Sequence, residues 1–202
     1  MPESKIHLSS AETQLMLNAE IILTKNSVLQ KIKSLLEELQ QEQNAFIREE
    51  GLQTNEPFFI SPKISKGENY QGLPYIILDY PRITNEKNFF LARSMFWWGH
   101  YFSSTIHLSG SFKNKYGENI RTAYQELQDY YIAINSDQWI HHFEEDNYKK
   151  IGSLTPDEFR KYYDRFEHVK IAAKWPLDKW QEASSELFVR WKFLMDVCGL
   201  IS

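Results

Sequence analysis

One arginine stands among apolar residues in a stretch that alternates like a β-strand. Arg93 lies two residues from Leu91 and two from Met95, so on a strand these three side chains share a face. A buried charge is costly unless it is paired, and Asp79, on the preceding predicted strand, is the nearest acidic candidate. A guanidinium in such a place can also grip a carboxylate or a phosphate. The residue types therefore indicate either an anion-binding site or a structural ion pair.

The next stretch adds polar groups at strand spacing. Period two divides residues 101–109 into an apolar side and a polar side, and the polar side carries Tyr101, Ser103, Thr105, His107 and Ser109. Trp97 or Trp98 would supply an aromatic wall beside them. The candidate ligand-binding residues are Asp79, Arg93, Trp97, Tyr101 and His107. The alternative is a solvent-facing sheet surface on which Asp79 and Arg93 form an ordinary cross-strand pair.

A second group of side chains raises the question of a metal. Imidazole and carboxylate groups that suit zinc gather in one short stretch, at His141, His142, Glu144 and Glu145. On a strand only His142 and Glu144 would share a side, so a third ligand such as His107 or His168 would have to come from elsewhere. Two ligands are too few for a closed site, and the sequence therefore predicts no metal site.

Motifs for covalent catalysis and for common cofactors are missing from the sequence. Cys198 falls on the apolar seam of a predicted helix, where a thiol is usually buried and unreactive. There is no Gly-x-Ser-x-Gly elbow, no glycine-rich dinucleotide or phosphate loop, and no His-Glu-x-x-His pair. We therefore expect no cofactor, and the sequence leaves open whether the protein is an enzyme.

Composition excludes several classes of protein. Of 202 residues 42% are hydrophobic and 15% aromatic, which is enough apolar surface for a packed core. The formal charge of −4, without any basic stripe, argues against nucleic acid as a partner. No window reaches the run of about 18 apolar residues that a membrane span requires, so we expect a soluble protein without a membrane partner. A single cysteine and an N-terminus without a basic and apolar leader predict a cytoplasmic location.

The first fifty residues predict two helices. Ser9 and Glu12 have the spacing of a capping box, in which each side chain binds an amide at the helix start. The dipeptide Asn26-Ser27 indicates a break and a new cap, and a second helix with one apolar face follows over 28–49. These signals predict an amphipathic helix that must bury one side.

The rest of the chain predicts a sheet followed by helices. Most of 52–72 is predicted as loop, and the predicted strands are 58–60, 75–80 closed by Pro81, 89–98, 101–109, 130–134, 138–143 and 169–175. Further helices are predicted over 112–127, from the cap Thr155-Pro156, and over 178–198. This order favours a single α+β domain over 1–202, a mostly antiparallel sheet of about five to six strands with amphipathic N- and C-terminal helices packed on one face.

A run of short motifs in the middle and later chain resembles a protein family. A Leu-Pro strand and an aromatic strand pair are followed by Lys115-Tyr116-Gly117, Asp137-Gln138-Trp139, the segment 158–163 (Glu-Phe-Arg-Lys-Tyr-Tyr) and Val169-Lys170. The run resembles the YktB-like small bacterial proteins of unknown function. That resemblance implies the same fold class and brings no catalytic residues with it.

Two functions are compatible with these observations. The first is a domain that binds a small anionic ligand in a pocket on the polar face of the sheet. The second is a non-enzymatic interaction module, in which surplus aromatic residues beside the helix over 28–49 bury against a second copy of the chain as a homodimer. A pocket containing Arg93 and His107 would favour the first, and a flat exposed aromatic patch would favour the second.

Overall fold

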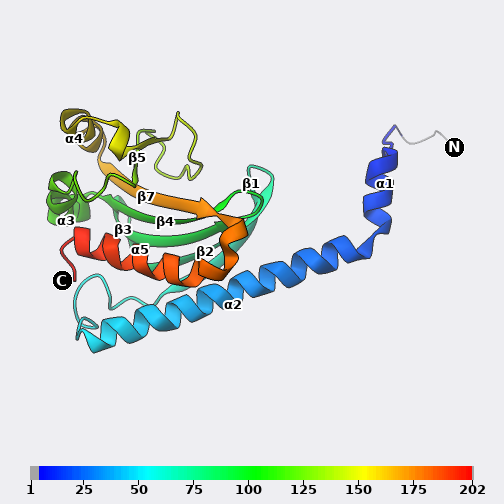
Figure 1. Cartoon of the computed structure of the whole chain (residues 1–202), viewed down its shortest axis with the longest axis horizontal. Helices are drawn as coiled ribbons and strands as arrows, with labels where there is room; N and C mark the ends of the chain where they lie inside the picture. Colours follow the sequence, from blue (N-terminus) through cyan, green and yellow to red (C-terminus); the bar gives the residue numbers. More distant parts are fainter. Residues whose placement is uncertain (1–4, 202) are drawn as a thin grey trace.

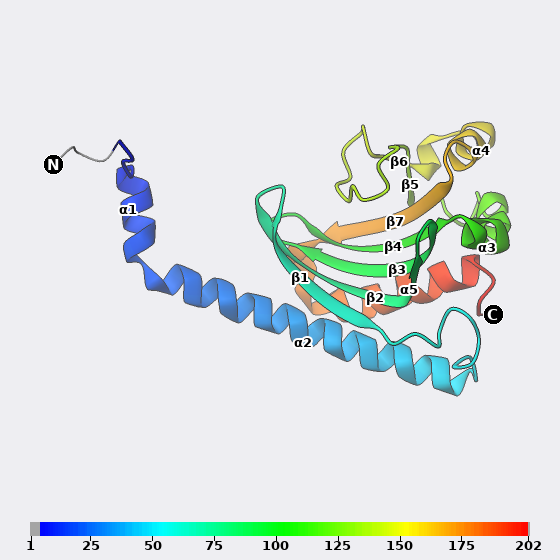
Figure 2. The ribbon, with the colours of Figure 1, turned by 180° about the vertical axis from the view of Figure 1, so that it is seen from behind.

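A curved antiparallel sheet and two long helices on one of its faces organise the computed structural model, which describes residues 5–201 (Figures 1 and 2). Within these residues the strands are β1 (Lys63–Tyr70), β2 (Leu73–Asn85), β3 (Asn88–Trp97), β4 (Tyr101–Ser109), β5 (Tyr131–Ala133), β6 (Tyr148–Lys150) and β7 (His168–Pro176). Their order across the sheet is β1-β2-β3-β4-β7-β5-β6, and every neighbouring pair is antiparallel. The α+β prediction is confirmed, with seven strands in the described part of the chain.

Helices begin and end the described chain. They are α1 (Ser10–Leu17), α2 (Ala19–Glu49), α3 (Ser111–Thr122), α4 (Pro156–Asp164) and α5 (Ala183–Val197), with 3-10 turns η1 (Ile151–Ser153) and η2 (Leu177–Glu182). The predicted caps at Ser9 and Thr155 are both present, and each is a capping box: Ser9 with Glu12 at α1, and Thr155 with Glu158 at α4. Such caps satisfy amides that have no partner inside the helix.

The main core lies between one face of the sheet and the helices α2 and α5. Side chains at alternate strand positions, such as Leu78, Phe102 and Ile106, are at most 1% exposed on this face. From the other side, Leu36 and Leu39 of α2 are fully buried against it. The apolar face of residues 28–49 is therefore covered by the chain's own sheet and α5, and a second copy is not needed to bury it.

Several predicted boundaries are wrong for identifiable reasons. The helix break falls at Asn18, whose side chain accepts from the Glu20 amide, and the chain runs as helix through Asn26-Ser27. Residues 58–60 form a turn, whereas β1 occupies part of the predicted loop. Its residues are mostly polar because β1 is an edge strand that buries little of either face.

Two further differences concern the sheet. Pro81 does not end β2. The register of β2 and β3 shifts between Asp79 and Arg82, so the strand pairing does not require a backbone N–H from the proline. Residues 138–143, predicted as a strand, form an irregular segment, while the short strand β6 follows it unpredicted. Helix α3 ends at Thr122, and the helical prediction over 178–198 begins with the 3-10 turn η2.

Candidate functional site

The five candidate residues lie on one face of the sheet, opposite the face that α2 and α5 cover. In the strand register Asp79 is opposite Arg93, and Trp97 is opposite Tyr101. His107 lies opposite Leu91, two positions along β3 from Arg93, and therefore emerges on the same side. The predicted common face of Arg93 and His107 is confirmed.

The guanidinium of Arg93 donates hydrogen bonds to two other side chains. Its Nε and Nη2 donate to the two carboxylate oxygens of Asp79, at 2.8 and 2.9 Å, and the two side chains are only 15% and 11% exposed. Its Nη1 donates to Nε2 of His141, at 3.1 Å. The predicted partnership with Asp79 is confirmed as a bidentate ion pair, and together with the bond to His141 it uses three of the five N–H groups of Arg93.

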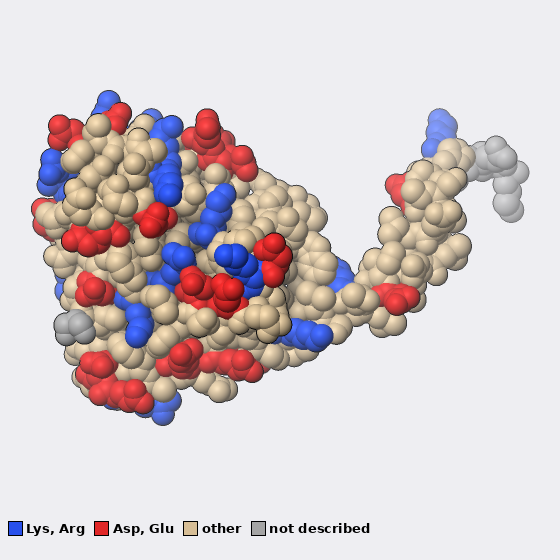
Figure 3. All heavy atoms as spheres, in the orientation of Figure 1, with Lys and Arg blue, Asp and Glu red and all other residues tan. Residues whose placement is uncertain are grey.

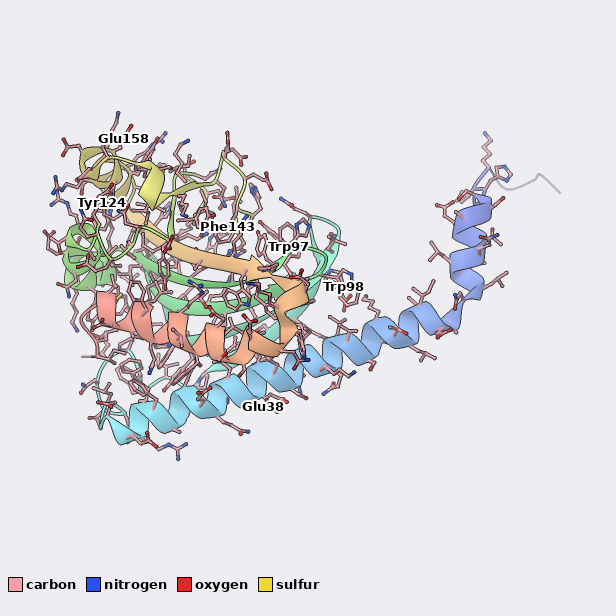
Figure 4. All side chains as sticks on the ribbon, in the orientation of Figure 1. Glu38, Trp97, Trp98, Tyr124, Phe143 and Glu158 are labelled. Carbon is pink, nitrogen blue, oxygen red and sulfur yellow. The ribbon has the colours of Figure 1, made fainter. Side chains whose placement is uncertain are left out.

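A segment between β5 and β6 covers this face. Residues 134–147, which we call the covering segment, follow β5 and return to β6 over the polar side of the sheet. The hydroxyl of Tyr70 accepts from the amides of His141 and His142, at 2.7 and 3.1 Å. Phe143 of this segment packs edge-on against Tyr101, with ring centroids 5.2 Å apart, and Figure 4 shows Phe143 on the side of the sheet away from α2. The face is thus buried, unlike the solvent-facing alternative.

His107 is held as a neutral imidazole beneath the covering segment. It is 4% exposed, and its Nε2 donates to the side-chain oxygen of Gln138, at 2.9 Å. Burial, together with the charges of Lys170 and His168, lowers the pKa of His107 to about 3. Burial and the charge of Lys170 also lower the pKa of His168 to about 4. The pKa of His141 is well below its usual value, chiefly because of burial.

Lys170 is the residue that sequence reasoning missed. It lies on β7 directly opposite His107 and is 1% exposed. Its ammonium donates to the carbonyl oxygen of Ile140, at 2.5 Å, and lies 5.4 Å from the ring centroid of Tyr148. Within residues 5–201 it forms no ion pair with a carboxylate. Burial, and then the nearby charge of Arg93, lower its pKa to about 7.

A signal for Lys170 was present in the sequence. Alternation over His168–Pro176 places Val169 and Ile171 on the core face, so Lys170 falls with His168 on the other side. The same argument identified Arg93 on β3. The lysine differs from the arginine in that no acidic residue stands opposite it, because its β4 neighbour is His107.

The remaining candidates have packing roles. Trp97 is 1% exposed, its indole nitrogen donates to the carbonyl oxygen of Tyr70 at 3.2 Å, and the imidazole of His100 stacks on its ring. Trp98, the alternative aromatic wall, packs against Phe96 of the main core and does not reach the polar face. The hydroxyl of Tyr101 donates to the carbonyl oxygen of His141 at 3.4 Å, and burial raises its pKa.

The segment 141–145 and Cys198 carry the side chains that could bind a metal or act as a nucleophile. In the described part of the chain no group of three or more histidine, cysteine or acidic side chains is arranged to hold a metal ion. His141 and His142 lie on the irregular covering segment, where His142 pairs with Asp146 at 3.8 Å. Cys198 is buried at the end of α5, and burial raises its pKa. A thiol in this environment stays protonated and unreactive.

Open hollows lie elsewhere on the surface. One of about 600 Å³ is formed by α2 with β1 and β2, and another of about 600 Å³ lies at the start of α2 beside Trp98. Neither is lined by the five candidate residues or by Lys170. The polar face is thus a buried cluster, closed by the covering segment.

No protein-family model, curated protein or solved structure matches this chain. The resemblance to the YktB-like proteins therefore stays a prediction. No helix in residues 5–201 is long and apolar enough to cross a membrane.

Proposed function

We propose that the protein binds a small anionic ligand on the polar face of the sheet, and that Lys170 supplies the charge that the ligand meets. The observation that carries this proposal is a lysine that is 1% exposed and has no carboxylate partner in the described chain. Arg93, the residue first expected to grip the anion, is neutralised by Asp79. Lys170 is therefore a buried cation that forms no ion pair in the described chain, although the charge of Asp137 acts on it from a distance.

The electrostatics of the face support an anion. Moving an ammonium group out of water is costly unless an opposite charge or several acceptors replace the water. Lys170 has a single carbonyl acceptor, that of Ile140, and the three histidines around it have lowered pKa values and are neutral near pH 7. A carboxylate or phosphate would offset the charge of Lys170 and accept from its N–H groups.

Entry of a ligand requires movement of the covering segment. Three polar contacts join this segment to the sheet close to Lys170: His107 with Gln138, Lys170 with Ile140, and Arg93 with His141. An anion that binds Lys170 would take the place of the Ile140 carbonyl as acceptor. The same event would separate residues near 140 from β7, so ligand binding and opening of the segment are coupled.

The test uses sulfate as the probe, because its charge does not change between about pH 6 and pH 9. Titration calorimetry of the full chain at about pH 6 should show sulfate binding that weakens as Lys170 loses its proton near its pKa of about 7. Lys170→Met should weaken sulfate binding about tenfold or more, the equivalent of about 1.4 kcal/mol. The matched control is Lys31→Met, at an exposed lysine of α2 on the opposite side of the sheet.

Two results contradict the proposal. The first is equal sulfate affinity in the wild type and in Lys170→Met. The second is a pH dependence that is the same in both proteins. We also propose a cytoplasmic location, which is supported by the single cysteine, free and buried in the structure.

A second candidate function is protein interaction as a homodimer. The observation that favours it is the exposure of large apolar side chains at the N-terminal end, including Met16 at 67% and Leu17 at 77%. Soluble monomers rarely leave such groups together in water. This function needs no chemistry on the polar face, so it is independent of the anion site.

A further inference from the structure

The N-terminal part of the chain stands away from the body of the protein. Helix α1 and the first two turns of α2, residues 10–25, which we call the arm, extend beyond the sheet and beyond α5 (Figures 1 and 2). No residue of α1 is buried. The large apolar side chains that the arm exposes are Leu15 (54%), Met16 (67%), Leu17 (77%), Ile21 (44%), Ile22 (56%) and Leu23 (66%).

These side chains surround the helices instead of forming one stripe. Consecutive residues of an α-helix are separated by about 100° of rotation, so three apolar residues in a row cover most of its circumference. The arm has such a triplet in each helix, at 15–17 and at 21–23. A helix that is apolar all round is normally enclosed, and an isolated helix of the eight residues of α1 is marginal in water. The arm therefore requires a surface to pack against.

The chain itself offers a hollow with the matching character. At the start of α2 a hollow of about 600 Å³ lies between the arm and the end of the sheet, lined by Asn18, Glu20, Ile21, Thr24, Lys25, Leu73, Pro74 and Trp98. Half of these residues are apolar, and one of them, Trp98, lies in the turn between β3 and β4. Figure 4 shows Trp98 at the end of the sheet from which the arm departs. Each copy thus carries both an apolar helix and a partly apolar hollow.

We propose that the arm docks on a second copy of this chain, with α1 of each copy packed in the hollow beside Trp98 of its partner. In a two-fold dimer each arm lies in the hollow of the other copy. Both arms and both hollows are then occupied, and no such surface remains for a third copy. The inference names the surface for the homodimeric function proposed above and rests on that function. The sequence had placed the dimer contact on the apolar helix face over 28–49, but the chain's own core already covers that face.

The available area fits a dimer. Apolar side chains of this size offer on the order of 100 Å² each when they leave water, and the arm exposes six of them. Two arms together therefore approach the lower end of the roughly 1,200–2,000 Å² that stable protein interfaces bury, before the lining of the hollow is added. A small partner that covered only one side of the helix would leave half of these side chains in water.

Charge favours a second copy over a lipid surface. Residues 10–25 contain Glu12, Glu20 and Lys25 as their charged groups, and Lys25 is paired with Glu68 at 2.7 Å. Figure 3 shows the arm as largely uncharged over its length. Helices that lie on membranes carry a basic face that meets anionic headgroups, which this arm lacks. Two nearly neutral arms do not repel one another when they approach.

The first experiment measures the mass of the full chain by sedimentation over a wide range of concentration. The wild type should be a dimer, and the double variant Leu17→Glu/Ile22→Glu should weaken dimerisation about a hundredfold or more, because it buries two carboxylates without partners. The matched control is Val189→Glu, since Val189 is 58% exposed on α5, away from the arm. Because these positions lie outside the core, both variants should keep the cooperative thermal unfolding of the sheet and its core, whereas far-ultraviolet circular dichroism of the double variant can fall by the helix content of the arm.

A second experiment identifies the contact. Chains carrying Met16→Cys are mixed with chains carrying Leu73→Cys under mild oxidation, and a disulfide between the two kinds of chain is expected. Cys198 does not interfere, since it is buried. Mixing Met16→Cys with Val189→Cys should give no such link, because Val189 lies outside the hollow.

The outcomes separate the inference from the function on which it rests. A wild type that remains monomeric at every concentration overturns both. A dimer that survives Leu17→Glu/Ile22→Glu and gives no Met16–Leu73 link overturns the arm as its interface, while homodimerisation itself stands. A monomer that sediments with vesicles of phosphatidylcholine and phosphatidylglycerol, and loses this binding in the double variant, overturns the second copy in favour of a lipid surface.

Discussion

Lys170 and His107 lie directly opposite one another on β7 and β4, and both side chains are at least 96% buried. Two basic groups in such a position cannot both be charged without strong repulsion. The lysine takes the proton at a pKa of about 7, and its charge contributes to lowering the pKa of the histidine to about 3. The polar face is therefore an environment in which protonation and stability depend on one another.

Replacing Lys170 by methionine should make the stability of the protein less dependent on pH. A lysine normally titrates at about 10.5, so between pH 7 and 10.5 the unfolded chain binds a proton that the folded chain releases. Burial of the ammonium is therefore most costly below pH 7, and this cost, of order 5 kcal/mol, disappears as pH rises to about 10. Denaturant unfolding should show Lys170→Met gaining relative stability near pH 6 and losing that gain near pH 10. A difference between the two proteins that stays constant with pH would contradict this prediction.

Replacing His168 by glutamine should reduce acid sensitivity. His168 has a pKa of about 4 in the folded protein against an ordinary value of 6.5, so the unfolded chain binds the extra proton as pH falls through this interval. The resulting loss of stability, of order 3 kcal/mol, is absent above pH 6.5 and complete below pH 4. Thermal melting between pH 7 and 4 should show a smaller decrease for His168→Gln than for the wild type. The control His7→Gln, at an exposed histidine, should melt like the wild type.

Replacing Asp79 by asparagine should destabilise the fold strongly. The substitution leaves Arg93 buried without its bidentate partner, and such a loss typically costs about 3–5 kcal/mol. The double variant Asp79→Leu/Arg93→Leu removes both charges and should be the more stable of the two. Urea unfolding measures both values. A cost below about 1 kcal/mol for Asp79→Asn would mean that water reaches the pair, as at an ordinary surface ion pair.

Replacing Tyr70 by phenylalanine should loosen the covering segment with little effect on the rest of the fold. The Tyr70 hydroxyl accepts from two amides of that segment, those of His141 and His142. Each hydrogen bond contributes about 0.5–1.5 kcal/mol, so hydrogen exchange at these amides should accelerate about tenfold. Tyr75→Phe is the control, since Tyr75 lies on the same side of the sheet and its hydroxyl does not contact these amides. Unchanged exchange in Tyr70→Phe would show that other contacts hold the segment.

Local periodicity predicted the sheet faces well. Alternation over β3 and β4 sorted Arg93, Tyr101 and His107 onto one side, and the cost of burying a charge identified Asp79 as the partner of Arg93. Both inferences depend on residues close in the chain or on adjacent strands. The capping boxes at Ser9 and Thr155 were predictable for the same reason, since a cap is decided within four residues.

The covering segment could not be predicted in this way. Its residues follow no helical or strand period, and its position depends on contacts across long stretches of chain, such as Tyr70 with His141. The burial of Lys170, and with it the charge balance of the site, depends on this segment. The arm was missed for a different reason: residues 15–23 are as apolar as a core helix, and only the tertiary structure shows that nothing in the described chain covers them.

The two outer strands of the sheet determine how copies of this protein can associate. An exposed outer strand offers unpaired amides and carbonyls that can add strands from other molecules, which leads to fibres. Here β6 has only three residues and ends in Lys149-Lys150, and β1 carries Lys63 and Lys66 with an irregular register against β2. Lysines and short or bent strands prevent such strand addition. With strand addition disfavoured at both edges, the proposed contact through the arm would end at two copies instead of growing without limit.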